Sequence, residues 1–242
     1  MAHFYLDEAL ASARVGDRVS LTGAEARHAV TVSRLAVGET VSIGNGAGLI
    51  VSGPVVVAEH TQLTIEVTVA TDVPRRDPAV FLAQALAKGD RDELAVQAAT
   101  ELGIDGVIPW SAARSISRWE GAKVAKGRDR WSAVVREASK QSLRAWVPDV
   151  LDLVSTKQLV KLGEATRMLV LEPTAAETLA DLVVDDRDLV LVVGPEGGIA
   201  PQELDALAAA GASIVRLGDE VLRTSTAGPA ALAVLNVKLG RW

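Results

Sequence analysis

The feature that most constrains this chain is a pair of glycine-marked turns between residues 189 and 227, each placed directly after a short apolar run. The run at residues 189–193, LVLVV, is continuous and rich in β-branched side chains, which predicts a strand buried on both faces of a sheet. GPEGG follows at once. A second run ends at Gly218, and the chain then enters a long apolar segment that predicts a helix up to residue 239. Both turns are expected at the carboxyl ends of strands, where open α/β sheets bind their ligands.

A third segment ends in the same way, because Leu171-Glu172-Pro173 closes the apolar run at residues 168–171. Taken alone, GPEGG could be a tight connection whose glycines only supply positive φ angles. Three such loops at the same edge of a sheet predict more than a connection. We expect them to line one pocket.

Composition limits the chemistry. The 242 residues contain no cysteine and three histidines, which excludes disulfides and thiolate nucleophiles and argues against a metal site, so we expect no metal. No secretory signal or membrane-length apolar run is visible, which predicts a soluble cytoplasmic protein without a membrane partner. The net charge of -6 weighs against a general nucleic-acid binder, although the distribution of charge matters more than its sum.

The chain divides by pattern into two domains. Residues 1–70 hold short β-rich runs at 4–6, 19–21, 41–43, 49–57 and 63–69 with one expected helix at 24–35, which predicts a small β-barrel-like domain. Residues 71–78 contain two prolines and four charges and form the expected linker. From residue 79 to 242 strands and helices alternate, beginning with a strand at 80–86 and a helix at 91–102 and including a long helix from about 129 to 143. This alternation predicts an α/β domain with a mainly parallel sheet and helices on both faces.

A basic region lies inside this acidic chain. Between residues 114 and 144 there are nine lysines and arginines and three carboxylates, a local balance of +6. Trp119, Trp131 and Trp146 are interleaved with these charges, and such a mixture suits phosphate contact and base stacking. The alternative is a solvated helix face with packed tryptophans. We favour RNA contact for the arginines and packing for the tryptophans.

The three loops together carry a resemblance. LEP at 171–173, GPEGG at 194–198 and LG…VLRTSTA at 217–227 resemble the cofactor loops of SPOUT methyltransferases, and within them the RsmE family, which methylates N3 of a uridine in 16S rRNA. The resemblance covers nearly the whole chain. It implies a C-terminal SPOUT domain tied in a trefoil knot, an N-terminal PUA-like RNA-binding barrel and a homodimer. It also implies the cofactor S-adenosyl-L-methionine and, as partner, the 16S rRNA of the small ribosomal subunit.

The resemblance also assigns roles to residues of this sequence. The residues that it implies for cofactor binding are Leu171, Glu172, Pro173, Gly194, Pro195, Glu196, Gly197, Gly198, Leu217, Gly218, Val221, Leu222, Arg223, Thr224, Thr226 and Ala227. The residues expected to contact RNA are His28, Arg34, Lys88, Arg114, Gln141, Ser142 and Arg144. In the KQSLR stretch at 140–144, Leu143 stands where the family usually has glycine.

The acceptor atom suggests the catalytic residues. Uridine N3 carries a proton and is a poor nucleophile until that proton leaves, so a base or a cation that stabilises the resulting anion is required. Arg144 and Arg223 are the candidates for the electrostatic role, because arginine stays charged and offers a planar fork of donors. The sequence identifies no clear base.

Two other functions are also compatible with the sequence. One is a non-catalytic RNA-binding factor in ribosome assembly, which the intact glycine loops disfavour. The other is a SPOUT enzyme that methylates a ribose 2′-hydroxyl of tRNA, which the N-terminal barrel and the match at Gln141, Ser142 and Arg144 disfavour. Motifs for nucleoside triphosphates, for hydrolase elbows and for dinucleotides are absent from the sequence.

Overall fold

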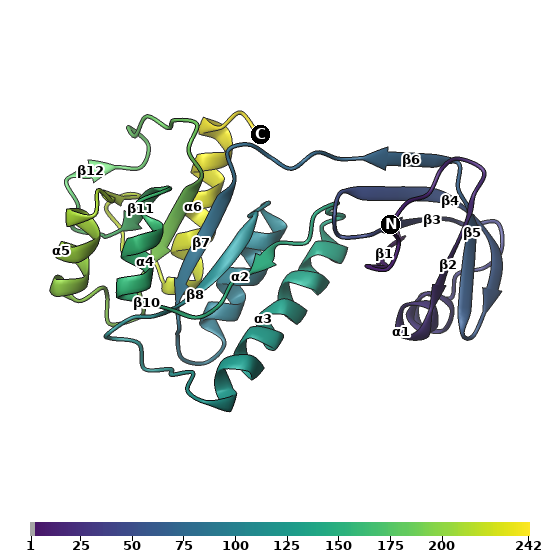
Figure 1. The fold of residues 1–242 in the computed structure, drawn as a ribbon, viewed down its shortest axis with the longest axis horizontal. Coiled ribbons are helices and arrows are strands. Elements are labelled where there is room, and N and C mark those ends of the chain that lie inside the picture. Colours follow the sequence, from purple (N-terminus) through teal and green to yellow (C-terminus); the bar gives the residue numbers. More distant parts are fainter. Residues whose placement is uncertain (1–2) are drawn as a thin grey trace. The chain divides into compact units, whose positions relative to one another are not determined.

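The computed structural model describes residues 3–242, which divide into two compact units (Figure 1). The first unit holds the chain up to Arg75 together with Ser139–Val147, and the second holds Arg76–Ala138 and Pro148–Trp242. The two units are close to the expected domains at 1–70 and 79–242 except in one segment. Residues 139–147, expected in the C-terminal domain, group with the first unit.

The first unit is built on a curved, mainly antiparallel sheet. Its strands are β1 (His3–Leu6), β2 (Arg18–Thr22), β3 (Thr40–Gly44), β4 (Leu49–Glu59), β5 (Gln62–Glu66) and β6 (Val69–Asp72). They run in the order β1-β3-β4-β5-β2, with β6 paired to β4 and only β1 and β3 parallel. Buried and partly buried residues alternate along the first part of β4, as expected of a strand with one face in a core. This core contains the buried side chains of Tyr5, Leu21, Ile43, Leu63 and Ile65.

One helical segment accompanies this sheet, and it is shorter than the predicted helix at 24–35. It begins as α1 (Gly23–Arg27) and continues as the π-helical turn η1 (His28–Val32). Ala26 and Ala29 are fully buried against the sheet. The left-handed backbone of Arg34, with φ of 56°, follows the segment and is incompatible with its continuation as a helix.

The segment Ser139–Val147 belongs to the first unit because specific contacts hold it there. The Lys140 ammonium lies 3.0 Å from the Glu25 carboxylate, and both side chains are largely buried. Gly48 N–H donates to the Ala145 carbonyl at 3.0 Å, and Val147 N–H donates to the Gly46 carbonyl at 3.0 Å. The glycine-rich loop at 44–48 is therefore more than a hairpin turn, since it also pairs with a distant part of the chain.

The second unit contains a parallel sheet. Its strands are β7 (Val80–Ala85), β8 (Gly106–Ser111), β9 (Asp149–Val150), β10 (Val154–Ser155), β11 (Arg167–Leu171), β12 (Glu177–Thr178), β13 (Leu189–Val193) and β14 (Ser213–Arg216). Their order is β10-β8-β7-β13-β11-β14-β12, with β9 beside β8, and the pairings are parallel. Every residue of β13 is buried. The predicted parallel sheet is confirmed, and its central strand is the LVLVV run.

Helices cover both faces of this sheet. They are α2 (Arg91–Glu101), α3 (Ala122–Gln141), α4 (Thr156–Leu162), α5 (Pro201–Ala209) and α6 (Thr224–Lys238). Successive residues of β7 show the two faces, because Leu82 lies against Gly228 of α6, whereas Ala83 packs with Leu159 of α4 and Leu207 of α5. Within residues 3–242 no helix is both long and apolar enough to cross a bilayer.

Helix α3 begins seven residues before the predicted start at about residue 129. The unpredicted first turns contain Gly127, and glycine inside a helix is unfavourable. The structure gives this glycine a packing role, because a Cβ there would overlap the indole ring of Trp119. Trp119 in turn meets the fully buried Trp131 edge-on, with the rings 5.4 Å apart.

Candidate active site

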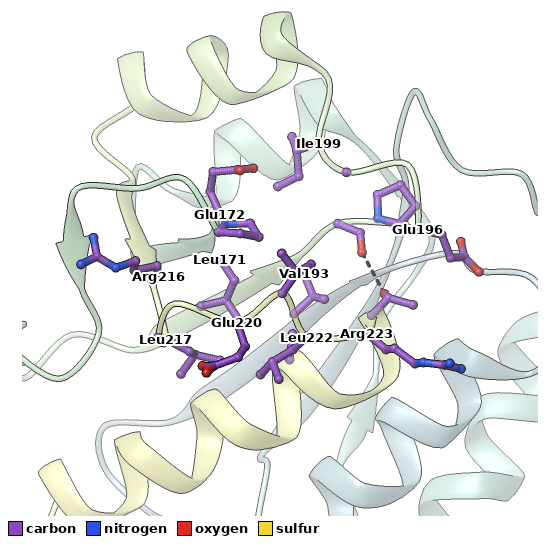
Figure 2. Close-up of a pocket in the computed structure, with 18 of the residues that line it drawn as sticks. Leu171, Glu172, Val193, Glu196, Ile199, Arg216, Leu217, Glu220, Leu222 and Arg223 are labelled. Carbon is purple, nitrogen blue, oxygen red and sulfur yellow. Dashed lines mark hydrogen bonds between the residues drawn. The ribbon is translucent and has the colours of Figure 1, made fainter.

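The carboxyl ends of β13, β11 and β14, three neighbours in the sheet, meet at one cavity of about 370 Å³ (Figure 2). The loops that follow these strands form its walls. The lining residues are Arg91, Leu171, Glu172, Pro173, Val193, Gly194, Pro195, Glu196, Gly198, Ile199, Val215, Arg216, Leu217, Gly218, Glu220, Val221, Leu222, Arg223, Thr224 and Ala227. A site at this edge is the usual one for an open α/β sheet.

Arg216, at the end of β14, holds the first loop in place. Its guanidinium Nη1 donates to the carbonyl oxygens of Ala175 and Ala176 at 2.7 and 2.8 Å. The backbone N–H of Glu172 donates to the carbonyl of Val215 at 3.0 Å, so main chain and side chain both tie this loop to β14. The LEP loop is thus fixed from the neighbouring strand.

The GPEGG loop is shaped by two glycines with different roles. A Cβ on Gly194 would lie 2.7 Å from Ile199 Cγ1, so this position has no room for a side chain. Gly198 has a left-handed φ of +71°, which glycine adopts without strain, and its N–H closes the turn onto the Pro195 carbonyl at 2.9 Å. Helix α5 then begins with Pro201 in its first turn, a position that proline favours.

Glu196 connects the GPEGG loop to the segment between β7 and α2. Its Oε1 atom accepts from the Lys88 backbone N–H and from Arg91 Nη1, both at 3.0 Å. Partial burial opposes ionisation of this carboxyl group, but hydrogen bonds from its own N–H, from Lys88 and from Arg91 outweigh burial and lower the pKa of Glu196 below its ordinary value. Glu196 is therefore an anion held in place at neutral pH.

The structure brings the residues expected to bind the cofactor together. All of them except Gly197 and Thr226 line the cavity. Sequence reasoning missed six lining residues, namely Arg91, Val193, Ile199, Val215, Arg216 and Glu220. Val193 and Arg216 are the last residues of β13 and β14, so a strand-end position was the signal that could have identified them.

The predicted catalytic and RNA-contacting residues are distributed over both units. Arg223 lines the cavity, and Figure 2 shows its guanidinium directed away from the Leu171 and Leu217 side chains. Arg114 Nη1 donates to the Gly197 carbonyl at 3.1 Å, which supports the GPEGG loop. Gln141, Ser142 and Arg144 lie in the first unit and are not among the lining residues.

His28 and Arg34, also predicted to contact RNA, lie at the two ends of the π-helical region of the first unit. Both are exposed. The His28 ring packs edge-on against Tyr5, with ring centroids 5.9 Å apart. This contact fixes the imidazole on the surface of the unit.

Comparison with known proteins places the chain in a family. Residues 75–236 match the model of an RNA methyltransferase domain, and residues 21–68 match that of an RNA methyltransferase PUA domain. The Mycobacterium bovis protein named Ribosomal RNA small subunit methyltransferase E is 45% identical, over 91% of this chain and 86% of its own. The Bacillus subtilis protein of the same name is 31% identical, over 90% and 89% of the two chains.

A solved structure extends the likeness to three dimensions. The Ribosomal RNA small subunit methyltransferase E of Neisseria gonorrhoeae, determined with bound S-adenosyl methionine, superposes with a TM-score of 0.87 at 28% identity and covers 98% of each chain. Matches to both domains, identity over most of the length and the common fold agree. The chain belongs to the RsmE family of RNA methyltransferases.

Proposed function

We propose that this chain transfers the methyl group of S-adenosyl-L-methionine to N3 of a uridine in the 16S rRNA of the small ribosomal subunit. The observation that carries the proposal is the cavity bounded by three strand-end loops in a chain of this family. Its relatives named Ribosomal RNA small subunit methyltransferase E support the choice of substrate, and the Neisseria gonorrhoeae structure supports the choice of cofactor.

The residues around the cavity fit this cofactor. Leu171, Leu217 and Leu222 provide apolar contacts for an adenine ring, and the loop backbone provides polar groups beside them. The carboxylates of Glu172 and Glu220 also line the cavity and suit the positive sulfonium and ammonium groups of the cofactor. The cavity volume of about 370 Å³ lies in the range of small-molecule sites.

The protein's own task follows from the chemistry of the two reactants. When bound, the cofactor supplies a methyl group that its sulfonium has already made electrophilic, so the chain must hold the acceptor in line with it. Loss of the N3 proton leaves negative charge on the uracil ring. Arg223 at the cavity, together with Arg144, would stabilise that charge.

The assembly that we propose is a homodimer. Helix α6 supports it, because its partly buried Ala230, Ala233 and Val234 and its exposed Thr226 and Val237 recur at helical spacing and form a small-residue and apolar stripe. Mass determination by light scattering tests the proposal. A monomer at micromolar concentration would exclude this assembly.

Three further parts of the proposal follow from the family. The C-terminal segment forms a trefoil knot, which is supported by the strand order β13-β11-β14 and by the return of Thr224 to Gly194. A crystal structure whose chain unties when its ends are drawn apart would exclude the knot.

The PUA-like unit docks on RNA through the exposed His28 and Arg34. The enzyme acts in the cytoplasm, where small subunits are assembled.

One experiment separates this function from its alternatives. Small ribosomal subunits that lack the modification are incubated with the full chain and labelled cofactor, and the rRNA nucleosides are analysed by mass spectrometry. We expect 3-methyluridine at one position. Binding of subunits without cofactor binding or methyl transfer would indicate an assembly factor, and a ribose-methylated nucleoside in tRNA would indicate a 2′-O-methyltransferase.

A further inference from the structure

A second cavity lies beside the first in the same unit, with a volume of about 530 Å³. It is formed by the segment between β7 and α2, the segment between β8 and α3, and the first half of α3. The lining residues are Ala87, Lys88, Gly89, Asp90, Asp92, Glu93, Ile116, Ser117, Arg118, Trp119, Lys123, Lys126, Gly127 and Arg130. None of the cofactor-loop residues belongs to this set.

The charges in the second cavity do not cancel. Three carboxylates line the cavity, and Arg130 forms ion pairs with two of them. Its Nη2 lies 3.1 Å from Asp90 Oδ1 and its Nε lies 2.6 Å from Glu93 Oε1. The third carboxylate, Asp92, is 5% exposed and accepts from the Ala87 backbone N–H at 3.2 Å, so it turns inward. The acidic side chains are therefore already engaged.

The lysines of the cavity remain available to an anion. Within residues 3–242, Lys88, Lys123 and Lys126 have no carboxylate within ion-pair distance, and all three are exposed. Lys123 and Lys126 lie three residues apart on α3, which places both on one side of the helix. Several ammonium groups on one wall suit the phosphates of a nucleic acid strand.

A flat aromatic surface completes the cavity. Trp119 lines it and is only half-buried. Its ring makes a T-shaped contact with Trp131 and lies against Gly127, where the missing Cβ lets the indole approach the helix backbone. Proteins that bind single-stranded nucleic acids combine basic side chains with aromatic rings on which the bases stack, and Trp119 beside the three lysines provides this combination.

The two cavities share a wall. Lys88 lines the second cavity, and its backbone N–H donates to Glu196, which lines the first. Arg91 lines the first cavity and also binds Glu196, while its neighbour Asp92 lines the second. Glu196 and the two groups that bind it therefore separate the cavities, and a ligand that occupies both would extend across them.

We infer that the second cavity binds a nucleotide of the RNA strand that flanks the target uridine, with its base stacked on Trp119 and its phosphates contacted by Lys88, Lys123 and Lys126. This inference rests on the proposed function, since it assigns a place to the strand next to the acceptor. It concerns the flanking nucleotide and not the methyl-accepting one. The specificity of the enzyme for its position in the RNA then depends partly on this cavity.

The test compares two double variants of the full chain that remove the same charge. The Lys123→Ala, Lys126→Ala variant removes two ammonium groups from the wall of the second cavity. The Lys157→Ala, Lys161→Ala variant removes two exposed lysines of α4 that line neither cavity. Methylation of unmodified small subunits is measured over a series of KCl concentrations, with cofactor affinity by calorimetry and melting temperature on the same preparations.

We expect the cavity variant to raise KM for subunits and to reduce the slope of log kcat/KM against log salt by about 1.4, since each phosphate contact on a single strand contributes roughly 0.7. Cofactor affinity should stay unchanged, and the α4 variant should keep the wild-type slope. Equal slopes for the two variants would overturn the inference. Absence of methylation by the wild-type chain would instead overturn the proposed function.

Trp119 is tested separately because its substitution can disturb packing. Trp119→Phe keeps an aromatic face, and Trp119→Leu keeps only apolar bulk against Trp131. Loss of one base–aromatic stack weakens binding roughly 5- to 150-fold, so we expect KM to rise by that factor in the leucine variant and less in the phenylalanine variant. A leucine variant with the wild-type melting temperature and KM would exclude stacking on this ring.

Discussion

Thr224, the first residue of α6, donates a hydrogen bond from Oγ1 to the carbonyl oxygen of Gly194 at 2.8 Å (Figure 2). The same hydroxyl accepts from Nε2 of the buried Gln84 at 2.8 Å. A single side chain therefore joins the third loop, the GPEGG loop and strand β7. Because the atoms involved are largely buried, each of these hydrogen bonds is costly to break.

Thr224→Val should lower both cofactor affinity and stability. Valine keeps the shape of the side chain but removes the partner of the Gly194 carbonyl and one of the two acceptors of Gln84 Nε2, which also donates to the Ala85 carbonyl at 3.2 Å. The loss of these buried hydrogen bonds costs about 1–3 kcal/mol. Thr224→Ser, which keeps the hydroxyl, is the matched control and should retain most of both. Calorimetric titration with S-adenosyl-L-methionine and thermal melting measure the two effects. Wild-type affinity in the valine variant would show that this bond does not position the loops.

Gly198→Val should lower cofactor affinity while the protein stays folded. The added Cβ meets no backbone atom within 4 Å, so the penalty comes from the left-handed φ of +71°, which is most unfavourable for a β-branched residue. Gly198→Asn should lose less, because asparagine tolerates this conformation. Calorimetric titration with S-adenosyl-L-methionine measures the affinity of both variants. Equal affinities would show that the left-handed conformation at residue 198 does not determine cofactor binding.

The elements that could be predicted from the sequence are those whose signal is local. The unbroken apolar run of β13 predicts a strand buried on both faces, and all five of its residues are buried. The glycine turns after β13 and β14 predict strand-end loops, since glycine is the residue that such turns require. Strand order, in contrast, is not encoded in local pattern.

The unpredicted features depend on contacts between residues that are distant in the sequence. Lys140 meets Glu25 across 115 positions, and this pair helps to place Ser139–Val147 in the first unit. Gly127 is a weak helix former that is explained only by the ring of Trp119. Arg216 ends β14, which indicates a place at the cavity, but its hydrogen bonds to the carbonyls of Ala175 and Ala176 join residues 41 and 40 positions apart and have no local signal.

Leu143→Gly should stabilise the chain by about 1 kcal/mol. Leu143 has a left-handed φ of 57° just after α3, where the Arg144 N–H donates to the Ser139 carbonyl and the Leu143 N–H to the Lys140 carbonyl, the pattern of a helix end that favours glycine. The leucine side chain is 47% exposed, so its loss removes little burial. Leu143→Ala keeps the strain and should show no gain. A lower melting temperature for the glycine variant would contradict this account.

Asp92 should make stability depend on pH. Burial raises the pKa of the Asp92 carboxyl above its ordinary value, although hydrogen bonds from the Ala87 and Glu93 N–H groups oppose the shift. The folded state therefore binds this proton more tightly than the unfolded state. The resulting stabilisation is complete below the ordinary pKa and is lost as pH rises through the raised value. Relative to Asp92→Asn, the wild-type chain should lose melting temperature as pH rises above the ordinary pKa of 3.8.

Asp185→Asn is the control for this pH series. The hydrogen bond from Arg187 holds the pKa of Asp185 at about 2, so any stability that it contributes is lost only as pH falls toward that value. Its difference from the wild-type chain should stay flat above about pH 5. A flat difference for Asp92→Asn as well would show that the Asp92 carboxyl titrates normally.

Arg144→Ala should leave cofactor binding nearly intact and reduce methyl transfer about 10²- to 10³-fold, the effect of losing one interaction made chiefly in the transition state. Arg144 lies in Ser139–Val147 and is not among the residues that line the cofactor cavity, so affinity for S-adenosyl-L-methionine has no reason to change. Arg144→Lys should recover only part of the rate, because a point charge cannot reproduce a bidentate fork. Single-turnover methylation of small subunits measures the rate.

The competing explanation for Arg144 is a purely structural one, in which its contacts hold the first unit together. In that case the Arg144→Ala variant would lose stability along with activity. The Arg144→Lys variant would then recover both properties to the same extent. Melting temperature, oligomer mass and cofactor affinity on the same preparations separate the two cases, with Arg187→Ala as a control for loss of an exposed arginine that pairs with the carboxylate of Asp185. A slow Arg144→Ala variant with the wild-type melting temperature supports stabilisation of the uridine anion. Normal turnover by that variant would remove Arg144 from the reaction and leave Arg223 as the remaining candidate.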